Sequence, residues 1–451
     1  MSVMPRDLAL SVLNSLEKAP GFPEQRMERM IGRERRLSTR DRAFVVHLIQ
    51  GVLRFRLRLD WIIEQTTRFS FRRIEPSVLN ILRIALFQIF FMERVPESAA
   101  VNEAVKQTKV FGKGHISGFV NGILRQICRN KKQISFPDPQ RERLRYLSVY
   151  HSYPEWLVGK WIREVGADSV ERLLEAGNRN PDLIVRTNRL KISRRDLIAR
   201  LGHEGIAATP TRYSPDGLKL RGLKGSVTRL SAFREGLFQV QDEAPQICSR
   251  LIFPAQGDFL LDLCAGVGGK STHLAELMRG DGEVLAVDVN RARLEKLRES
   301  SRRLGICCIQ HVVADAGAKL SRTFNRPFDK ILVDAPCSGL GVLSRNPDAK
   351  WSKTNSDIRR LARLQLSILR EAVALLRKGG NMLYVTCTIS KEENEDVVSE
   401  FLTHNPEMIL EDLNARVPEW GLDLVDDRGF FRTGPRLHEM DGFFAALFRK
   451  K

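Results

Sequence analysis

The amino-acid sequence predicts a multidomain chain, with an all-α bundle first, a small α+β unit in the middle and an α/β domain with a parallel sheet last. Its 451 residues suffice for two to four domains. Residues 1–130 carry apolar side chains at helical spacing. From residue 258 onward, short apolar runs alternate with helical segments, which is the pattern of a parallel sheet.

The N-terminal segment, residues 1–130, is predicted to be helical almost throughout. Apolar residues follow helical spacing over 41–64, and the pattern repeats over 78–91 and 99–110. Pro76 and Pro96 stand just before helices, where a missing backbone N–H costs little. A bundle of five or more helices is therefore expected.

The middle of the chain, residues 131–240, combines a linker, a helix and a small α+β unit. Residues 130–145 are basic, contain two prolines and show little periodicity, so they are interpreted as a linker. Residues 156–176 are predicted to be helical. Between 183 and 240, three short strands and a helix near 194–201 are expected.

The C-terminal domain, residues 241–451, is predicted to contain a parallel sheet with helices between its strands. Short apolar runs mark five strands, at residues 259–263, 284–288, 309–315, 331–334 and 382–386. Right-handed crossovers through the intervening helices would make these strands parallel. A last strand is expected at 443–448.

The chain is strongly basic, with 73 Lys and Arg against 54 Asp and Glu and a net charge of +19. Residues 1–145 hold 27 basic and 14 acidic residues, a net of +13. This excess indicates an anionic partner, either nucleic acid or an acidic membrane surface, and makes the N-terminal part a candidate nucleic-acid surface.

Hydropathy and cysteine usage limit the class of protein further. The apolar segment 84–92, interrupted by Gln88, has nine residues, too few to span a bilayer, and no secretory signal is apparent. We therefore expect a cytoplasmic protein without a membrane partner. Seven cysteines without a CxxC pair predict neither a disulfide scaffold nor a metal site.

A glycine-rich turn, DLCAGVGGK at residues 262–270, follows the first strand of the predicted sheet. Glycines there let the backbone turn sharply and bring a ligand close to the main chain. A dinucleotide-binding turn would need glycine where Ser271 stands, and a phosphate-binding P-loop would need it at Cys264. NAD, FAD and ATP are therefore disfavoured.

Three acidic residues, Asp288, Asp315 and Asp334, close the following strands of the predicted sheet. In an open parallel sheet, ligands bind at the carboxyl ends of the strands. An acidic residue after the second strand suits a ribose diol, although a single strand-end Asp is often only a helix cap. A nucleoside ligand is favoured, and S-adenosyl-L-methionine is the natural candidate.

Two cysteines, Cys337 and Cys387, follow the next two strands, and adjacent strands would bring them to one edge of the sheet. A lone cysteine is usually a packing residue. Two thiols at one nucleoside site suggest chemistry on a pyrimidine, because a thiolate that adds to C6 makes C5 nucleophilic. A second thiol could assist the later elimination, Asp334 could hydrogen-bond the base, and Lys270 could lower the thiol pKa.

These motifs resemble those of the RNA cytosine-5 methyltransferases. DAPCSG at 334–339, TCT at 386–388 and CAGVGGK at 264–270 carry the resemblance, and VPESAAVNEAVKQTK and FVNGILR resemble the NusB-like domain of the RsmB/Sun branch. The resemblance implies a Rossmann-like S-adenosylmethionine-dependent methyltransferase domain that modifies a cytidine of 16S ribosomal RNA. It implies Cys387 as nucleophile and Cys337 as release-assisting thiol. The implied cofactor-binding residues are Cys264, Ala265, Gly266, Val267, Gly268, Gly269, Lys270, Asp288, Asp315 and Asp334.

Val267 departs from the family pattern, which has proline there, and proline would stiffen the turn. Two alternative functions stay open. A non-catalytic RNA-binding or antitermination factor would need neither Cys337 nor Cys387. A cytosine-5 methyltransferase of transfer RNA would use the same chemistry, and composition does not separate it from a ribosomal RNA enzyme. We expect a monomer.

Overall fold

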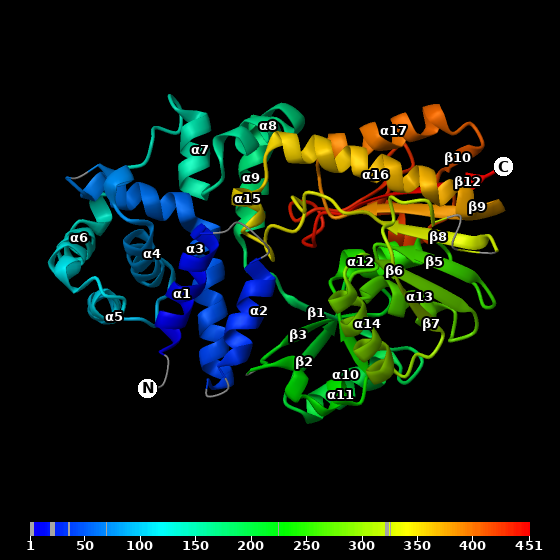
Figure 1. The fold of residues 1–451 in the computed structure, drawn as a ribbon, viewed down its shortest axis with the longest axis horizontal. Helices are drawn as coiled ribbons and strands as arrows, with labels where there is room; N and C mark the ends of the chain where they lie inside the picture. Colours follow the sequence, from blue (N-terminus) through cyan, green and yellow to red (C-terminus); the bar gives the residue numbers. More distant parts are fainter. Residues whose placement is uncertain are drawn as a thin grey trace. The chain divides into compact units, whose positions relative to one another are not determined.

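The computed structural model describes residues 4–18, 23–34, 37–68, 70–223, 225–320, 324 and 326–451 (Figure 1). They belong to two compact units, Met1–Arg179 with Asn346–Ser352, and Asn180–Arg345 with Lys353–Lys451. The predicted domain boundaries at 130 and 240 stay predictions. Within the described ranges, no helix combines the length and apolarity that crossing a membrane requires.

The first unit begins with the predicted all-α bundle. Its helices are α1 (Pro5–Lys18), α2 (Pro23–Arg33), α3 (Thr39–Thr66), α4 (Pro76–Phe91), α5 (Glu97–Val110) and α6 (Ser117–Arg129). Helix α4 is buried over most of its length and forms the centre of the bundle. A Cβ on Gly51 of α3 would collide with the ring of Phe87 on α4, so the glycine allows these two helices to approach closely.

Three helices complete the first unit: α7 (Arg143–His151), α8 (Glu155–Val165) and α9 (Ala167–Asn178). The helical prediction over 156–176 is confirmed with one break, because Gly166 takes φ +82° and separates α8 from α9. Most of the predicted linker, residues 134–142, has neither helix nor strand.

A short segment from the C-terminal half of the chain, Asn346–Ser352, also belongs to the first unit. It contains α15 (Ala349–Ser352), in which Lys350 is fully buried. The Lys350 ammonium donates to the Ser152 carbonyl at 3.3 Å and to Asn178 Oδ1 at 2.6 Å. Trp351 Nε1 donates to the Leu53 carbonyl at 2.6 Å. These contacts explain why the segment folds with residues far from it in sequence.

The second unit opens with the small α+β unit. Its elements are β1 (Leu183–Thr187), α10 (Arg194–His203), β2 (Ala207–Pro210), β3 (Gly217–Arg221), α11 (Ser231–Arg234) and β4 (Phe238–Val240). The strands form an antiparallel sheet in the order β2-β3-β1-β4. The sequence interpretation missed β2, which lies at the edge, ends in Pro210 and has no buried residue to give an apolar alternation.

The larger sheet of the second unit contains the six predicted strands: β5 (Phe259–Leu263), β6 (Glu283–Asp288), β7 (Ile309–Val313), β8 (Phe328–Asp334), β9 (Leu376–Thr386) and β12 (Phe444–Lys450). The sequence interpretation missed two short strands, β10 (Met408–Glu411) and β11 (Phe431–Arg432). Strands β9, β8, β5, β6 and β7 are parallel neighbours in that order. The last strand, β12, is antiparallel to β9. Strand β7 ends at Val313, so Asp315 lies beyond it rather than closing it.

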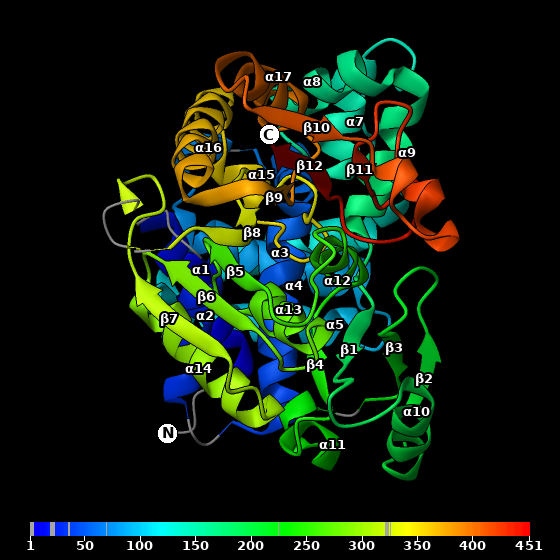
Figure 2. The ribbon, with the colours of Figure 1, turned by 90° about the vertical axis from the view of Figure 1, so that its right-hand side faces the viewer.

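Helices cover both faces of this sheet (Figures 1 and 2). Helices α12 (Glu243–Arg250), α13 (Gly269–Leu277) and α14 (Arg291–Leu304) pack on one face, and α16 (Asn355–Leu375) and α17 (Glu395–His404) pack on the other. Neighbouring residues of β5 lie on opposite faces: Leu260 belongs to the hydrophobic core under α12, α13 and α14, and Leu261 belongs to the core under α16 and α17. Double coverage explains why the strands are apolar runs.

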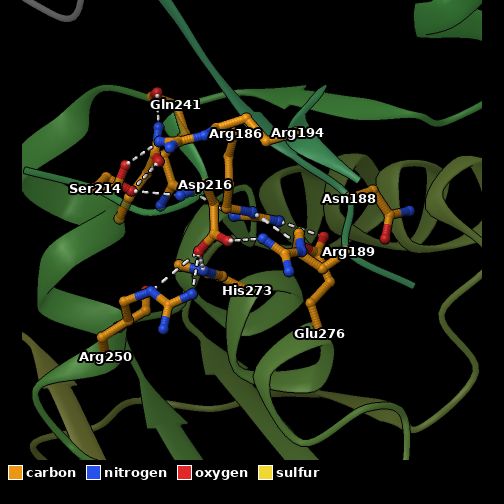
Figure 3. A network of polar contacts seen from close by, with 12 residues as sticks. Arg186, Asn188, Arg189, Arg194, Ser214, Asp216, Gln241, Arg250, His273 and Glu276 are labelled. Atoms are coloured by element: carbon orange, nitrogen blue, oxygen red, sulfur yellow. Dashed lines mark hydrogen bonds and ion pairs between the residues drawn. The ribbon is translucent and has the colours of Figure 1, made fainter. Parts of the chain in front are cut away.

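A buried polar network joins the small α+β unit to helix α13 (Figure 3). Arg186 of β1 has no exposed surface and donates to the Glu276 carboxylate at 2.7 Å and to the Gly269 carbonyl at 2.7 Å. Beside it, Asp216 accepts from Arg250 at 3.0 Å and lies 3.3 Å from His273 Nε2. Because Gly269 is the first residue of α13, Arg186 fixes the start of that helix.

This network predicts a large loss of stability in the variant Arg186→Ala. Glu276 would remain buried without its partner, which costs about 3–5 kcal/mol of unfolding free energy. Thermal and denaturant unfolding would measure the loss. Arg189→Ala is the matched control, since Arg189 is 52% exposed and 3.7 Å from Asp216, an arrangement that contributes about 0–1 kcal/mol. Equal losses in the two variants would contradict the role of Arg186.

Candidate active site

The candidate site lies where the strand order of the large sheet reverses. The chain passes from β5 to β6 and β7 on one side, then returns to β8 on the other side of β5. The loops after β5 and β8 therefore begin side by side but turn away from each other, one toward β6 and the other toward β9. This divergence opens a crevice at the carboxyl ends of these strands. The first loop is the glycine-rich turn and the second holds Cys337.

The glycine-rich turn has the backbone geometry that its sequence predicts. Gly266 and Gly268 have φ of +59° and +81°, and a Cβ on Gly268 would collide with Leu297 of α14. Cys264 also has a positive φ, +65°, which is uncommon for a residue with a side chain. Val267, at the position where proline was expected, is 49% exposed and has no part in the packing beneath the turn.

Asp288 and Asp315 differ in their surroundings. Asp288 is buried at the end of β6, where its carboxylate accepts from the Gly266 N–H at 2.9 Å and the Asn290 N–H at 2.7 Å. It therefore holds the glycine turn, and its oxygens retain lone pairs for a further donor. Asp315 is exposed and accepts from the Gly317 N–H at 2.9 Å.

Lys270 and Asp334 form an ion pair between the two loops. Lys270 Nζ lies 2.6 Å from Asp334 Oδ2, and the lysine is almost completely buried. Burial is the largest single effect and would lower the pKa of Lys270, but the charge and hydrogen bond of Asp334, together with the nearby Cys248 and Cys387, raise it overall. The lysine is therefore held as a cation beside an aspartate that remains partly exposed.

Cys337 and Cys387 lie together, with 3.3 Å between their Sγ atoms. The Gly341 N–H, in the loop after Cys337, donates to the Cys387 carbonyl at 3.0 Å. A side chain on Gly341 would collide with the Gly442 backbone, so the loop can pack this closely only with glycine there. The contact with Cys387, together with burial, raises the pKa of the Cys337 thiol well above its ordinary value, so this thiol is protonated at neutral pH.

The sequence interpretation left three polar residues of this region outside the site. Asp262 on β5 is fully buried, accepts from Ser271 Oγ, and has its pKa raised to about 7 by burial. Glu393 and Asn394, between β9 and α17, bond to residues on either side of the two cysteines. The EN pair in SKEENEDVV at 390–398 was visible, but nothing in the sequence showed which way the side chains point.

Away from this site, in the first unit, a histidine and two glutamates lie close together. His151, Glu171 and Glu175 place potential ligand atoms within 4.8 Å of one another. Glu171 is, however, already paired with Arg143 at 2.8 Å and with His151 at 3.2 Å. The cluster is thus explained by ion pairing between α7 and α9.

The sheet order, the glycine-rich turn and the crevice at the strand reversal define a Rossmann-like methyltransferase domain. Family models match three parts of the chain: NusB family over residues 4–129, an RsmF/B-like ferredoxin-like domain over 153–225, and 16S rRNA methyltransferase RsmB/F over 250–449. The chain belongs to this RsmB/F family of RNA methyltransferases. The fold class expected from the sequence, including the NusB-like bundle, is confirmed.

Relatives agree with the family models over the whole chain. The probable ribosomal RNA small subunit methyltransferase B of Bacillus subtilis (strain 168) is 35% identical over 448 residues, covering 99% of this chain and 98% of that protein. The crystal structure of PH0851 covers 100% of both chains at 26% identity with a TM-score of 0.81. NSun6 from Pyrococcus horikoshii, solved with SFG, covers 66% of this chain and 99% of its own at 26% identity, with a TM-score of 0.59.

Burial of Asp262 predicts a pH dependence of stability. A carboxyl with a pKa near 7 in the folded state and near 4 in the unfolded chain binds more protons when folded, so its contribution to stability falls as pH rises from 4 to 7. Asp262→Asn keeps an oxygen for Ser271 but does not titrate. Relative to the native protein, this variant should gain about 2 kcal/mol of unfolding free energy between pH 5 and pH 7. Denaturant unfolding at several pH values would measure the difference, and a constant difference would exclude the raised pKa.

Proposed function

We propose that this chain transfers a methyl group from S-adenosyl-L-methionine to C5 of a cytidine in 16S ribosomal RNA through a covalent bond between Cys387 and C6. The observation that carries the proposal is the pair of thiols, 3.3 Å apart, at the crevice where the strand order reverses. A pyrimidine that reaches one thiol there would also be within reach of the other.

The residues around the glycine turn fit the cofactor. Gly266 and Gly268 take the positive φ of the turn and have no side chains that would block a ligand there. Asp288, already oriented by two backbone N–H groups, has lone pairs left for ribose hydroxyls. Residues 264–270 and Asp315 would complete the site. When bound, the cofactor supplies an electrophilic methyl group on a sulfonium.

The two thiols would have different roles in the reaction. The Cys387 thiolate adds to C6, and the resulting enamine-like C5 takes the methyl group. A base then takes the C5 proton, and the electron pair of the broken C–H bond expels Cys387 from C6 as a thiolate, which restores the aromatic base and frees the enzyme. We assign Cys337 to this release: its raised pKa makes it a poor competitor for C6, and its thiolate, formed once the thiol has given its proton to solvent, is the base that takes the C5 proton.

Lys270 and Asp334 would act on the base and on the charge of the site. Asp334 is partly exposed, so it could hydrogen-bond the Watson–Crick edge of the cytosine while it stays paired with Lys270. The lysine cation would favour a thiolate at Cys387, since a nearby positive charge stabilises the anion.

Two observations support ribosomal RNA as the substrate. The relatives that match the full chain are named ribosomal RNA small subunit methyltransferases, which favours 16S over transfer RNA. The net charge of +13 over residues 1–145 would attract an RNA backbone. To reach a thiol at the end of a sheet, the target base must leave its stack with the neighbouring bases.

Separate cysteine variants test the mechanism. Cys387→Ala should abolish methyl transfer and form no covalent adduct, because the nucleophile is missing. Cys337→Ala should still attack but release slowly, so it should accumulate a protein–RNA complex that survives denaturation. Denaturing gels with 16S ribosomal RNA and radiolabelled cofactor would measure both.

The opposite pattern, an adduct with Cys387→Ala only, would reverse the two roles. Two mildly destabilised but active variants would indicate packing roles and reject the thiol mechanism. Cys308→Ala, a half-buried cysteine on the connection between α14 and β7, is the matched control and should keep full activity.

The ribose assignment predicts weaker cofactor binding in Asp288→Ala. Loss of the acceptor leaves a hydroxyl pair without its partner, which costs about 1–3 kcal/mol, or roughly 5–150-fold in affinity. Titration calorimetry with S-adenosyl-L-methionine would measure it. Asp315→Ala, at an exposed position, should lose less. Native affinity in Asp288→Ala would refute the assignment.

A further inference from the structure

Two adjacent residues beneath the thiols, Glu393 and Asn394, have no role in the mechanism above. Glu393 ends the short helix η6 (Lys391–Glu393), and Asn394 precedes α17. Their exposed fractions are 0% and 1%, and they lie seven residues or fewer beyond Cys387. A carboxyl buried to this extent costs free energy unless it is fully hydrogen-bonded, so its partners are informative.

Glu393 holds the chain on both sides of Cys337. Its Oε1 accepts from the Ser338 N–H at 2.8 Å, and its Oε2 accepts from the Ser338 hydroxyl. Gln365 Nε2 reaches Glu393 Oε1 at 3.2 Å and the Pro336 carbonyl at 2.9 Å. The residues before and after Cys337 are therefore tied, directly or through one amide, to a single carboxyl group.

Asn394 holds the chain on both sides of Cys387 in the same way. Its Oδ1 accepts from the Thr386 hydroxyl at 2.6 Å, and its Nδ2 donates to the Thr388 carbonyl at 3.0 Å. One further contact joins the two halves, because the Ser338 and Thr388 hydroxyls are 2.8 Å apart. Four bonds from two neighbouring residues thus fix both loops that carry a thiol.

We propose that Glu393 and Asn394 are positioning residues, Glu393 for the release thiol Cys337 and Asn394 for the nucleophile Cys387. The proposal rests on the two-thiol function stated above. The hydrogen bonds of these two side chains go to residues beside the cysteines and to Gln365, so each acts through the cysteine whose neighbours it holds. A displacement of about 1 Å in a reacting group can cost about 10²-fold in rate, which is the scale of effect expected.

The positioning roles predict opposite defects from two neighbouring substitutions in the full-length protein. Glu393→Ala should resemble loss of Cys337: attack proceeds, release slows, and covalent complex accumulates while turnover falls at least 10-fold. Asn394→Ala should resemble loss of Cys387: adduct forms at least 10-fold more slowly in a single turnover and does not accumulate. Denaturing gels and methyl transfer with 16S ribosomal RNA measure both quantities.

Controls separate positioning from general destabilisation. Asp396→Ala, three residues beyond Glu393, removes a carboxylate that is 53% exposed and lies 3.7 Å from Lys391, and it should behave as the native protein. All variants should bind S-adenosyl-L-methionine within about twofold of native affinity. Glu393→Gln should recover part of the release rate, since its amide can still accept from the Ser338 N–H and donate to the hydroxyl. Asn394→Asp should not recover attack, because a carboxylate oxygen would face the Thr388 carbonyl.

Variants of the partner residues keep the test decisive if an alanine variant fails to fold. Ser338→Ala removes the hydroxyl that donates to Glu393, and Thr386→Val removes the donor to Asn394; they should show the same two defects. If Cys337→Ala and Cys387→Ala differ as expected but the Glu393 and Asn394 variants share one uniform loss, positioning is refuted and the thiol mechanism stands. If the cysteine variants themselves do not differ, the proposed function fails, and the positioning roles fail with it.

Discussion

The reversal of strand order between β5 and β8 is the constraint on which the site depends. It places the glycine turn and the Cys337 loop side by side, and the ion pair between Lys270 and Asp334 joins them across the reversal. Strand β9 lies next to β8 in parallel register, so its end brings Cys387 to the same edge. Residues 64 positions apart, such as Lys270 and Asp334, thus meet because of sheet topology rather than local structure.

Strand ends and turn chemistry made much of this arrangement predictable from sequence. The parallel strands were apolar runs because helices cover both faces, and a residue that directly follows such a run must lie at the sheet edge. This reasoning placed Cys337 and Cys387 together. It was less accurate at Asp315, because β7 ends two residues earlier than its apolar run suggested. The antiparallel direction of β12 was also hidden, since strand direction depends on the connection rather than on side-chain pattern.

Features that depend on distant partners were not predictable. The sequence around Lys350 gives no sign that α15 belongs with the first unit, because the acceptors for its ammonium lie near residues 152 and 178. Gly166 divides a continuous helical pattern, and only its positive φ shows the break. From their sequence context, Glu393 and Asn394 would be expected to be exposed polar residues before a helix. Their burial follows from the loop after β8, which no local pattern connects to them.

The distribution of buried charge separates structural from functional polar groups. Arg186 and Glu276 neutralise each other, and the bond from Arg186 to the Gly269 carbonyl ties the pair to the start of α13. Among the residues that the structure describes, no lysine or arginine pairs with Glu393. Burial raises its pKa, and hydrogen bonds from Ser338 and Gln365 only partly oppose that effect. A neutral amide would satisfy most of the same bonds without the cost of burying a carboxyl. The charge of Glu393 is also among the causes that raise the pKa of Cys337, after the contact with Cys387 and burial. A carboxyl beneath the two thiols therefore acts on the Cys337 thiol through its charge, which an uncharged amide would not do.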